Sequence, residues 1–259
     1  MRTGRWRNGA LLGVVVAALA YWREALTADA AVAAAAVGCV TFARGGLSGA
    51  AGLLAFFGSS TVLSRVGQKA KERMPLAQAK GSRRDAWQVL ANGGVATLCF
   101  LLGKRYAAMC ALAAASADTW ATEVGMLAGG EPRLITTLRR VAPGTSGGVT
   151  PHGLLASVGG ALTVGLTARN QWRAIVLGGL CGSLVDSLLG ATLQGVYRCE
   201  RCDVLTESAL HQRCGAPTVH LKGLTWMTND MVNLLATLAG AAIGWWRMPD
   251  TAGHVRGGS

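Results

Sequence analysis

Eight apolar stretches recur along this sequence, and they limit what the chain can fold into. A helix that crosses a bilayer needs about 20 mostly apolar residues, so the first two stretches are short for a full crossing. Charged residues make up 15% of the chain, whereas a soluble domain carries about 25%. We therefore predict an all-α, polytopic membrane helix bundle of seven or eight spans with short cytoplasmic loops. The stretches fall at roughly 9–22, 28–43, 47–63, 86–103, 105–128, 153–168, 173–195 and 224–246.

Three polar connections divide the later spans and give the chain its predicted sidedness. We expect a single integral membrane domain over residues 1–259, and in this layout all three connections lie on one face. They carry fourteen Lys or Arg residues, against four on the opposite face, and an excess of positive charge marks the cytoplasmic side. The predicted order is N-terminal spans at 9–63, a basic loop at 64–85, spans at 86–128, a Gly-rich loop at 129–152, spans at 153–195, a Cys/His loop at 196–222 and a last span at 224–246.

The N-terminal charges conflict with this sidedness. Eight full spans put Arg2, Arg5 and Arg7 on the outer face, so one of the first three segments is a candidate for a partial span. Many of the apolar runs consist of Ala and Gly rather than Leu, and small residues let helix backbones approach closely in lipid. We therefore predict tight helix packing.

Four carboxylates lie within or beside the apolar segments: Asp118, Glu123, Asp186 and Asp230. A carboxylate at membrane depth costs roughly 2.5 to 3.5 kcal/mol even on lenient insertion scales, so its presence calls for a function. Helical spacing places these acids on or beside polar stripes. A hard cation such as Mg²⁺, shared with substrate phosphates, would keep the acids ionised. The alternatives are a proton-linked site, or stripes that only hold helices together. The stripes are Gln88 with Asn92; Ser116, Thr119 and Glu123; Ser183, Asp186, Ser187, Gly190 and Gln194; and Asn229, Asn233 and Thr237.

Two of the loops have the composition of phosphate-binding segments. The Gly-rich loop places Gly144–Gly148 directly before a predicted helix, where backbone N–H groups can hold a phosphate. It lacks the P-loop pattern, so a simple hairpin connector is an equal alternative. The basic loop can bind phosphates through its cations, and the alternative is that it binds lipid headgroups. These cations are Arg65, Lys69, Lys71, Arg73, Lys80, Arg83 and Arg84.

The third loop contains two short pairs of metal-binding side chains. Cys199 and Cys202 form one pair, and His211 and Cys214 form the second, after eight intervening residues. Three thiolates and one imidazole suit a closed, tetrahedral structural zinc site. A redox pair of cysteines and unliganded thiols remain alternatives, with His220 as a substitute ligand.

An ordered set of segments resembles one integral membrane family, which includes the plant phytyl-phosphate kinase of tocopherol synthesis and animal transmembrane protein nineteen. The resemblance covers roughly residues 40–246. It implies transfer of the terminal phosphoryl group of a nucleoside triphosphate, with CTP as the expected donor, to phytyl phosphate or another isoprenyl monophosphate. The segments are SRVGQKAK, VLANGG, ASADTWATEVG, PGTSGGVT, GSLVDSLLGATLQ, the CxxC loop and TNDMVNLL.

The resemblance also implies roles for individual residues. Asp118, Glu123, Asp186 and Asp230 would be catalytic and carry Mg²⁺, while asparagines would orient oxygens or complete the metal shell. Phosphates would be held by basic side chains and by the Gly-rich turn. These expected substrate-binding residues are Lys69, Lys80, Arg83, Arg84, Asn92, Gly144, Thr145, Ser146, Gly147, Gly148, Asn229 and Asn233.

The expected partners are a nucleoside triphosphate, an isoprenyl monophosphate and the lipid bilayer, without nucleic acid; a homo-oligomer stays open. Because no plastid-targeting extension is visible, we expect a prokaryotic cell membrane, or a plastid envelope if the source is a photosynthetic eukaryote. A prenol or lipid kinase, a cytidylyltransferase and an ion-coupled transporter remain alternatives. A transporter of this size typically has inverted repeats, and we see no convincing repeat in the sequence.

Overall fold

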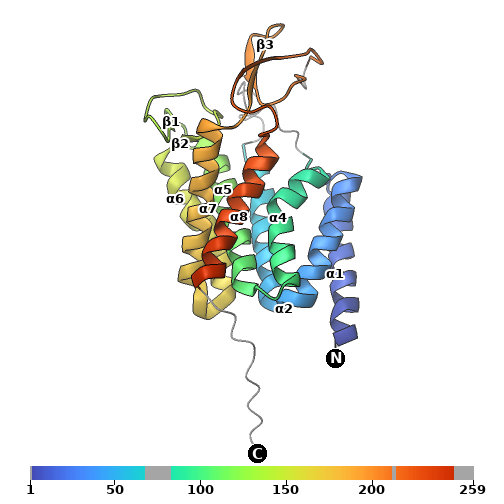
Figure 1. The fold of residues 1–259 in the computed structure, drawn as a ribbon. Helices are drawn as coiled ribbons and strands as arrows, with labels where there is room; N and C mark the ends of the chain where they lie inside the picture. The colour runs from blue at the N-terminus through green and yellow to red at the C-terminus, as the bar shows by residue number, and fades with distance from the viewer. Residues whose placement is uncertain (1, 68–82, 212–213, 248–259) are drawn as a thin grey trace, which may run out of the picture.

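The computed structural model describes residues 2–67, 83–211 and 214–247, and its helices stand side by side in one bundle (Figure 1). Each predicted apolar stretch corresponds to a helix or to half of one. The helices are α1 (Arg2–Trp22), α2 (Ala28–Arg65), α4 (Ala86–Leu101), α5 (Arg105–Leu127), α6 (Pro151–Gly165), α7 (Trp172–Thr192) and α8 (Asn229–Arg247), with a 3₁₀ helix η2 (Leu166–Gln171) between α6 and α7.

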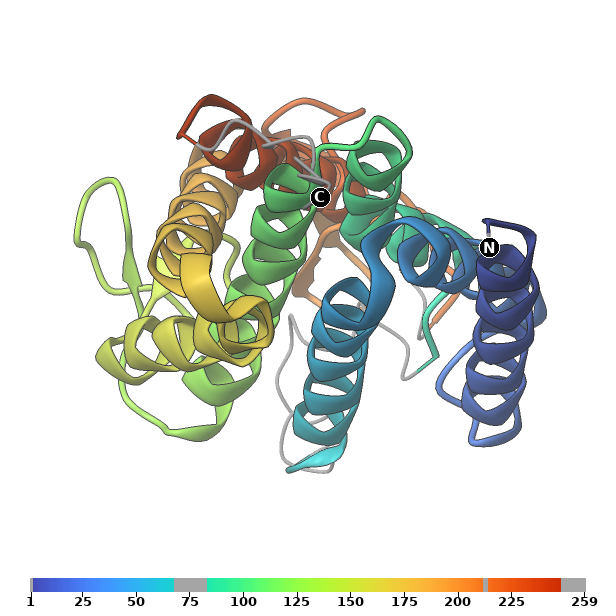
Figure 2. The same cartoon turned by 90° about the horizontal axis from the view of Figure 1, so that it is seen from below.

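Helix α2 is a helical hairpin that joins two of the predicted stretches. Its 38 residues would extend about 57 Å as one straight helix. Instead, the chain bends at Gly46, where φ is +65° and ψ is −155°, a conformation that glycine adopts most readily. The hairpin brings the end of α2 back to the segment that precedes its start. Arg65 Nη2, at the end of α2, donates to the carbonyl of Arg23, five residues before α2, at 2.7 Å. Figure 2 shows the two arms, residues 28–45 and 47–65, as neighbouring helices joined by a bend.

Among the described helices, α2 and α7 are both long and apolar enough to cross a membrane, and α4 is a shorter apolar helix. Counting the two arms of α2 separately, the described chain contains the eight helical segments that the sequence predicts. The number of membrane crossings therefore stays a prediction.

Two small sheets correct the prediction of an all-α chain with short loops. In the Gly-rich loop, β1 (Arg133–Leu134) pairs antiparallel with β2 (Gly148–Val149). The Cys/His loop forms a three-stranded antiparallel sheet in the order β4-β3-β5, with β3 (Val196–Cys199), β4 (Val204–Thr206) and β5 (Val219–Lys222). Both sheets lie at the same end of the bundle, opposite the start of α1 (Figure 1). The predicted one-sided placement of these two loops is confirmed.

Helix α5 forms the centre of the bundle. Every residue from Ala107 to Ala117 is buried, and α5 contacts α2, α4, α6, α7 and α8. Small residues of its neighbours make this close approach possible: a Cβ built on Gly160 would lie 2.6 Å from the Ser116 carbonyl oxygen, and one on Gly182 only 2.4 Å from Ala114 Cβ. The predicted tight packing through small residues is confirmed.

This packing predicts that adding one methyl group at Gly182 destabilises the protein. Gly182→Ala places the new Cβ against Ala114 and against the Ala236 carbonyl oxygen, 2.8 Å away, and overpacking of this kind costs about 1 to 3 kcal/mol. Gly58→Ala is the matched control, since nothing lies within 4 Å of its added Cβ. Thermal unfolding in detergent should show a lower midpoint for Gly182→Ala and an unchanged or higher midpoint for Gly58→Ala. Equal midpoints would contradict the packing of α7 on α5.

Candidate functional site

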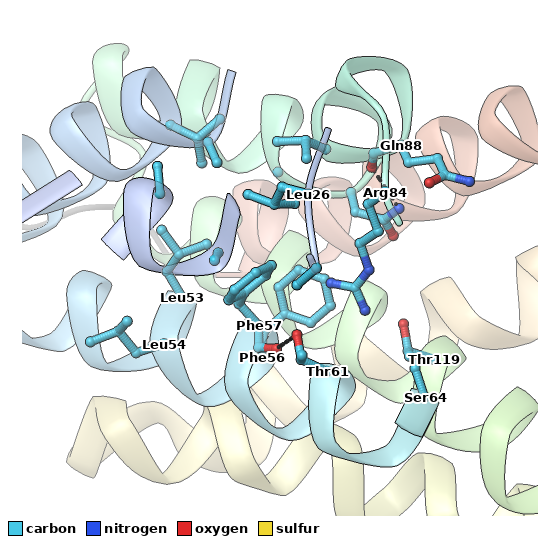
Figure 3. Close-up of a pocket in the computed structure, with 18 of the residues that line it drawn as sticks. Leu26, Leu53, Leu54, Phe56, Phe57, Thr61, Ser64, Arg84, Gln88 and Thr119 are labelled. Atoms are coloured by element: carbon cyan, nitrogen blue, oxygen red, sulfur yellow. Dashed lines mark hydrogen bonds between the residues drawn. The ribbon is translucent and has the colours of Figure 1, made fainter. Parts of the chain in front are cut away.

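A cavity of about 550 Å³ lies between both arms of α2 and the helices α1, α4, α5 and α8. One part is apolar and the other polar, and Figure 3 shows the labelled Leu and Phe side chains on one side and Arg84, Gln88, Ser64 and Thr119 on the other. The cavity therefore has the polarity of an amphipathic ligand. Its larger apolar lining residues are Leu12, Val16, Leu26, Val37, Phe42, Leu53, Leu54, Phe56, Phe57, Val89 and Met126.

Three of the four predicted polar stripes converge on the polar part of this cavity. Residues four positions apart on α4 and on α8 face it together, as helical spacing predicts. On α5 the lining residues come from two adjoining faces, which brings both predicted acids of that helix to the cavity. The stripe residues that line it are Gln88, Asn92, Asp118, Thr119, Glu123, Asn229 and Asn233.

The two carboxylates of α5 are half-buried at this polar end. Ser64 Oγ, at the end of α2, donates to Glu123 Oε1 at 2.5 Å, which ties the second arm of α2 to α5. By contrast, Asp186 and Asp230 are half-buried without lining the cavity. Within residues 2–67, 83–211 and 214–247, the four acids do not form a cluster tight enough to share one metal ion. The structure thus brings together two of the four predicted metal-binding acids.

Arg84 supplies a fixed positive charge to the same cavity. Its backbone N–H donates to the Ala25 carbonyl at 3.0 Å, and its own carbonyl accepts from the Thr27 N–H at 3.0 Å. The side chain points into the space between Phe57, Thr61 and Thr119 (Figure 3), with the guanidinium carbon 5.4 Å from the centroid of the Phe57 ring. Burial lowers the pKa of Arg84 and the nearby Glu123 charge raises it. Because a guanidinium loses its proton only far above neutral pH, the side chain stays charged at neutral pH.

Of the other predicted cations that the structure describes, Arg65 also lines the cavity, whereas Arg83 does not. Arg83 is exposed, donates to the Leu26 carbonyl at 3.1 Å and lies over the Tyr21 ring. Lys69 and Lys80 lie outside the described residues. The start of α4 is fixed by a capping box, in which Asp85 accepts from the Gln88 N–H at 2.9 Å and the Gln88 side chain accepts in return. This cap fixes where α4 begins, and Gln88 and Asn92, one turn apart on α4, both line the cavity.

The Gly-rich loop touches the cavity at one point. Residues 142–145 form a turn in which the Thr145 N–H donates to the Ala142 carbonyl at 3.1 Å. Gly144 occupies its third position with φ +85° and lines the cavity, whereas Thr145, Ser146, Gly147 and Gly148 do not line it. Gly147 has φ +74° and lies against α7, where an added Cβ would be 2.4 Å from the Ala191 nitrogen.

Several lining residues were not predicted from the sequence. Ser64 follows Phe57 and Thr61 at helical spacing, so the phase of α2 contains the signal that identifies it. Glu207 also lines the cavity and accepts a hydrogen bond from Ser146 Oγ. It comes from a different loop, 61 residues further along the chain, and no local pattern in the sequence indicates this contact.

The four predicted zinc ligands come together in the Cys/His loop. The ligand atoms of Cys199, Cys202, His211 and Cys214 all lie within 4.8 Å of one another. Donation from the Ala216 backbone N–H and the hydrogen bond with His211 lower the pKa of the Cys214 thiol to about 6, which favours the thiolate form. His220 lies apart from this group, with its ring edge-on to Tyr197 at a centroid distance of 5.2 Å.

Comparisons with known proteins agree with a membrane protein of this kind. The family described as integral membrane protein DUF92 matches residues 11–241. Protein PGR of Arabidopsis thaliana is 33% identical over 88% of this chain and 91% of its own length. An uncharacterized membrane protein of Methanocaldococcus jannaschii is 34% identical over 74% of this chain and 73% of its own. Protein VTE6, chloroplastic, of Arabidopsis thaliana is 24% identical over 84% of this chain and 64% of its own. No solved structure matches the chain.

The cavity predicts a sharp boundary of water access along α8. Asn233 lines the cavity, whereas Thr237, one turn further on, is 1% exposed and donates to the Ala91 carbonyl at 3.1 Å. We expect Asn233→Cys to react with a small water-soluble methanethiosulfonate reagent, and Thr237→Cys to resist it. Peptide mapping by mass spectrometry measures both extents of modification. Equal labelling of the two positions would contradict the cavity.

Proposed function

This chain belongs to the integral membrane family described as DUF92, and we propose that it is a membrane-bound phosphotransferase. Its acceptor is an isoprenyl monophosphate, such as phytyl phosphate, and its donor is a nucleoside triphosphate, with CTP as the first candidate. The product is the isoprenyl diphosphate. The helical segments cross the bilayer as seven or eight spans, and the sheets face the cytoplasm or its equivalent in a plastid. A prokaryotic cell membrane or a plastid envelope is the proposed location.

The division of the cavity into an apolar and a polar part is the observation that carries this proposal. Lining residues on α1 extend from Leu12 to Ala20, a distance of about 12 Å along the helix axis. An isoprenyl tail fits the apolar section between α1 and the two arms of α2, and its phosphate then lies at the polar end. There it meets Arg84 and the polar side chains of α4, α5 and α8.

The polar end has the groups that phosphoryl transfer requires. This reaction depends on positioning and on charge stabilisation more than on covalent catalysis. Arg84 binds phosphate oxygens, and the asparagine side chains orient them. Asp118 and Glu123 fit Mg²⁺, which takes one or two carboxylates and completes its shell with phosphates and water; when bound, the ion neutralises charge on the transferred group. A phosphate acceptor is already ionised at neutral pH, so no side chain has to act as a general base.

Family membership supports the choice of substrate. The chain is similar to VTE6 over most of its length, and the segments described above resemble the family that includes the plant phytyl-phosphate kinase. The chain is more similar to PGR than to VTE6. The isoprenyl chain length and the nucleotide are therefore part of the proposal, which rests on the cavity and on the resemblance of these segments.

The direct test is to incubate the purified protein with isoprenyl monophosphates of several lengths and with each nucleoside triphosphate. We expect an isoprenyl diphosphate and a nucleoside diphosphate in equal amounts. Release of pyrophosphate would instead identify a cytidylyltransferase, and a preference for the free prenol would identify a prenol kinase. Absence of turnover with every pair, combined with proton- or ion-driven uptake into liposomes, would identify a transporter.

In the same assay, Asp118→Asn should lower kcat about 100-fold or more, because it removes an ionised oxygen that holds the metal and its phosphates. Glu131→Gln is the control, since Glu131 is an exposed acid that pairs with Arg140 away from the cavity. Both variants should elute as the same monodisperse species in detergent. Near-normal turnover of Asp118→Asn at saturating Mg²⁺ would contradict the assignment of this residue.

The apolar section predicts a change in chain-length preference. Ala34 lines the cavity on the first arm of α2, so Ala34→Leu should raise KM for long isoprenyl phosphates more than for short ones. Ala36→Leu is the matched control, because Ala36 is exposed on the same arm and does not line the cavity. A uniform change for all chain lengths would argue against a tail in this section.

A further inference from the structure

We infer that Cys199, Cys202, His211 and Cys214 bind one zinc ion, and that this ion holds Glu207 against the Gly-rich loop at the polar end of the cavity. This inference concerns the metal and the position of a loop. It does not depend on the proposed reaction.

The spacing of the four side chains matches a single tetrahedral metal centre. Cys199 Sγ lies 3.5 Å from Cys214 Sγ, and His211 Nδ1 lies 3.1 Å from the same sulfur. Ligands bound to zinc at 2.3 Å through sulfur and at 2.0 to 2.1 Å through nitrogen lie roughly 3.5 to 3.8 Å apart. A disulfide joins two sulfurs at about 2.05 Å and involves no third or fourth side chain, whereas here four ligand atoms lie within 4.8 Å of one another.

Two tight turns present these ligands in pairs. Cys199 ends β3, and Cys202 stands in the turn to β4, next to Asp203 with its positive φ of 52°. In the second turn the Gly215 N–H donates to the His211 carbonyl at 2.8 Å, and Gly215 has φ +67°. Cys199 is fully buried and His211 is 4% exposed. Cys202 and Cys214 are half-buried. Four protein ligands form a closed set with no position left for a substrate, so the zinc is structural.

In the sequence, Glu207 lies between the two ligand pairs, so a metal ion bound to both pairs fixes the chain before and after Glu207. It directly follows β4, which pairs with β3 through Cys199 and Val204 and through Tyr197 and Thr206. Cys202 precedes Glu207 by five residues and His211 follows it by four. Binding both pairs to one ion removes much of the conformational freedom of the segment between them.

The position of Glu207 determines where the Gly-rich loop lies. Ser146 Oγ donates to the Glu207 carboxylate, and the two residues come from different loops. Gly144 and Glu207 both line the cavity, while Gly147 packs against α7. The Gly-rich loop is therefore held on one side by α7 and on the other by the zinc-bound segment, which makes Glu207 a positioning residue.

The first test measures the metal. Protein purified without chelators from zinc-supplied cells should contain one equivalent of zinc by elemental analysis, and Co²⁺ substitution should give the intense thiolate-to-metal absorption of a tetrahedral site. Cys202→Ser and His211→Ala should each lower the zinc content to below half. Two control variants should keep one equivalent: His220→Ala, because His220 packs on Tyr197, and Cys181→Ser, because Cys181 lies on α7. Absence of zinc from the unmodified protein would overturn the inference.

The second test measures the loop by hydrogen–deuterium exchange. Removal of zinc should speed amide exchange of residues 144–148 and of the Cys/His loop about tenfold or more. Glu207→Ala should keep its zinc and speed exchange of residues 144–148 alone. Glu200→Ala is the control, because Glu200 is an exposed acid of the same Cys/His loop, and it should change neither the zinc content nor the exchange of residues 144–148. If zinc removal leaves exchange of residues 144–148 unchanged, the positioning role is wrong even when the metal is present. Neither readout requires enzymatic turnover, so failure of the proposed function leaves this test intact.

Discussion

The close contact of neighbouring helix backbones with α5 is the constraint on which the rest of the structure depends. Eleven consecutive buried residues, nearly all small, allow α6, α7 and α8 to approach this helix through their own glycines. In lipid, packing of this kind replaces the hydrophobic effect as the main source of helix association. Beyond Ala117 the burial of α5 decreases, and there the helix carries Asp118, Thr119 and Glu123. The tightly packed part of α5 thus fixes the position of the polar part.

The polar end of the cavity is stable because its charges are compensated within the protein. Arg84 is held by backbone hydrogen bonds to the α1–α2 connection and lies close enough to Glu123 for the two charges to interact. Glu123 also accepts a hydrogen bond from Ser64. When two opposite charges lie close together inside a protein, their attraction offsets part of the desolvation free energy that each would cost alone. Under the proposed function, an anionic phosphate entering the cavity would pair with Arg84, and its cation would pair with Glu123.

The sequence predicts those parts of the molecule in which local spacing determines the outcome. The apolar stretches correspond to the helices, and residues four apart on α4 and α8 meet in one cavity because the helical repeat places them on one face. The two predicted ligand pairs in the Cys/His loop also come together, and each pair lies in a single tight turn. Here the structure shows which histidine lies with the three cysteines, because His211 joins the cluster and His220 packs on Tyr197.

The remaining features depend on contacts between distant segments. The stripe of α7 is polar like the others, yet Asp186 does not line the cavity, since the rotation of a helix in a bundle is set by its neighbours. The contact of Ser146 with Glu207 joins two loops, and the strands of these loops are too short to give a periodic pattern. The bend at Gly46 lies between two predicted stretches, but the sequence alone does not show that the two arms fold back on each other there.

The central claim is that the cavity binds an isoprenyl monophosphate with its phosphate near Arg84 and its tail between α1 and α2. Photo-crosslinking with an isoprenyl monophosphate that carries a diazirine at the end of the tail, followed by peptide mapping, tests this claim most directly. We predict adducts on residues 12–17 of α1 and 34–42 of α2, and their loss when unlabelled isoprenyl monophosphate is added in excess. Adducts spread over the outer faces of α6 and α7, or adducts that persist under competition, would contradict the account.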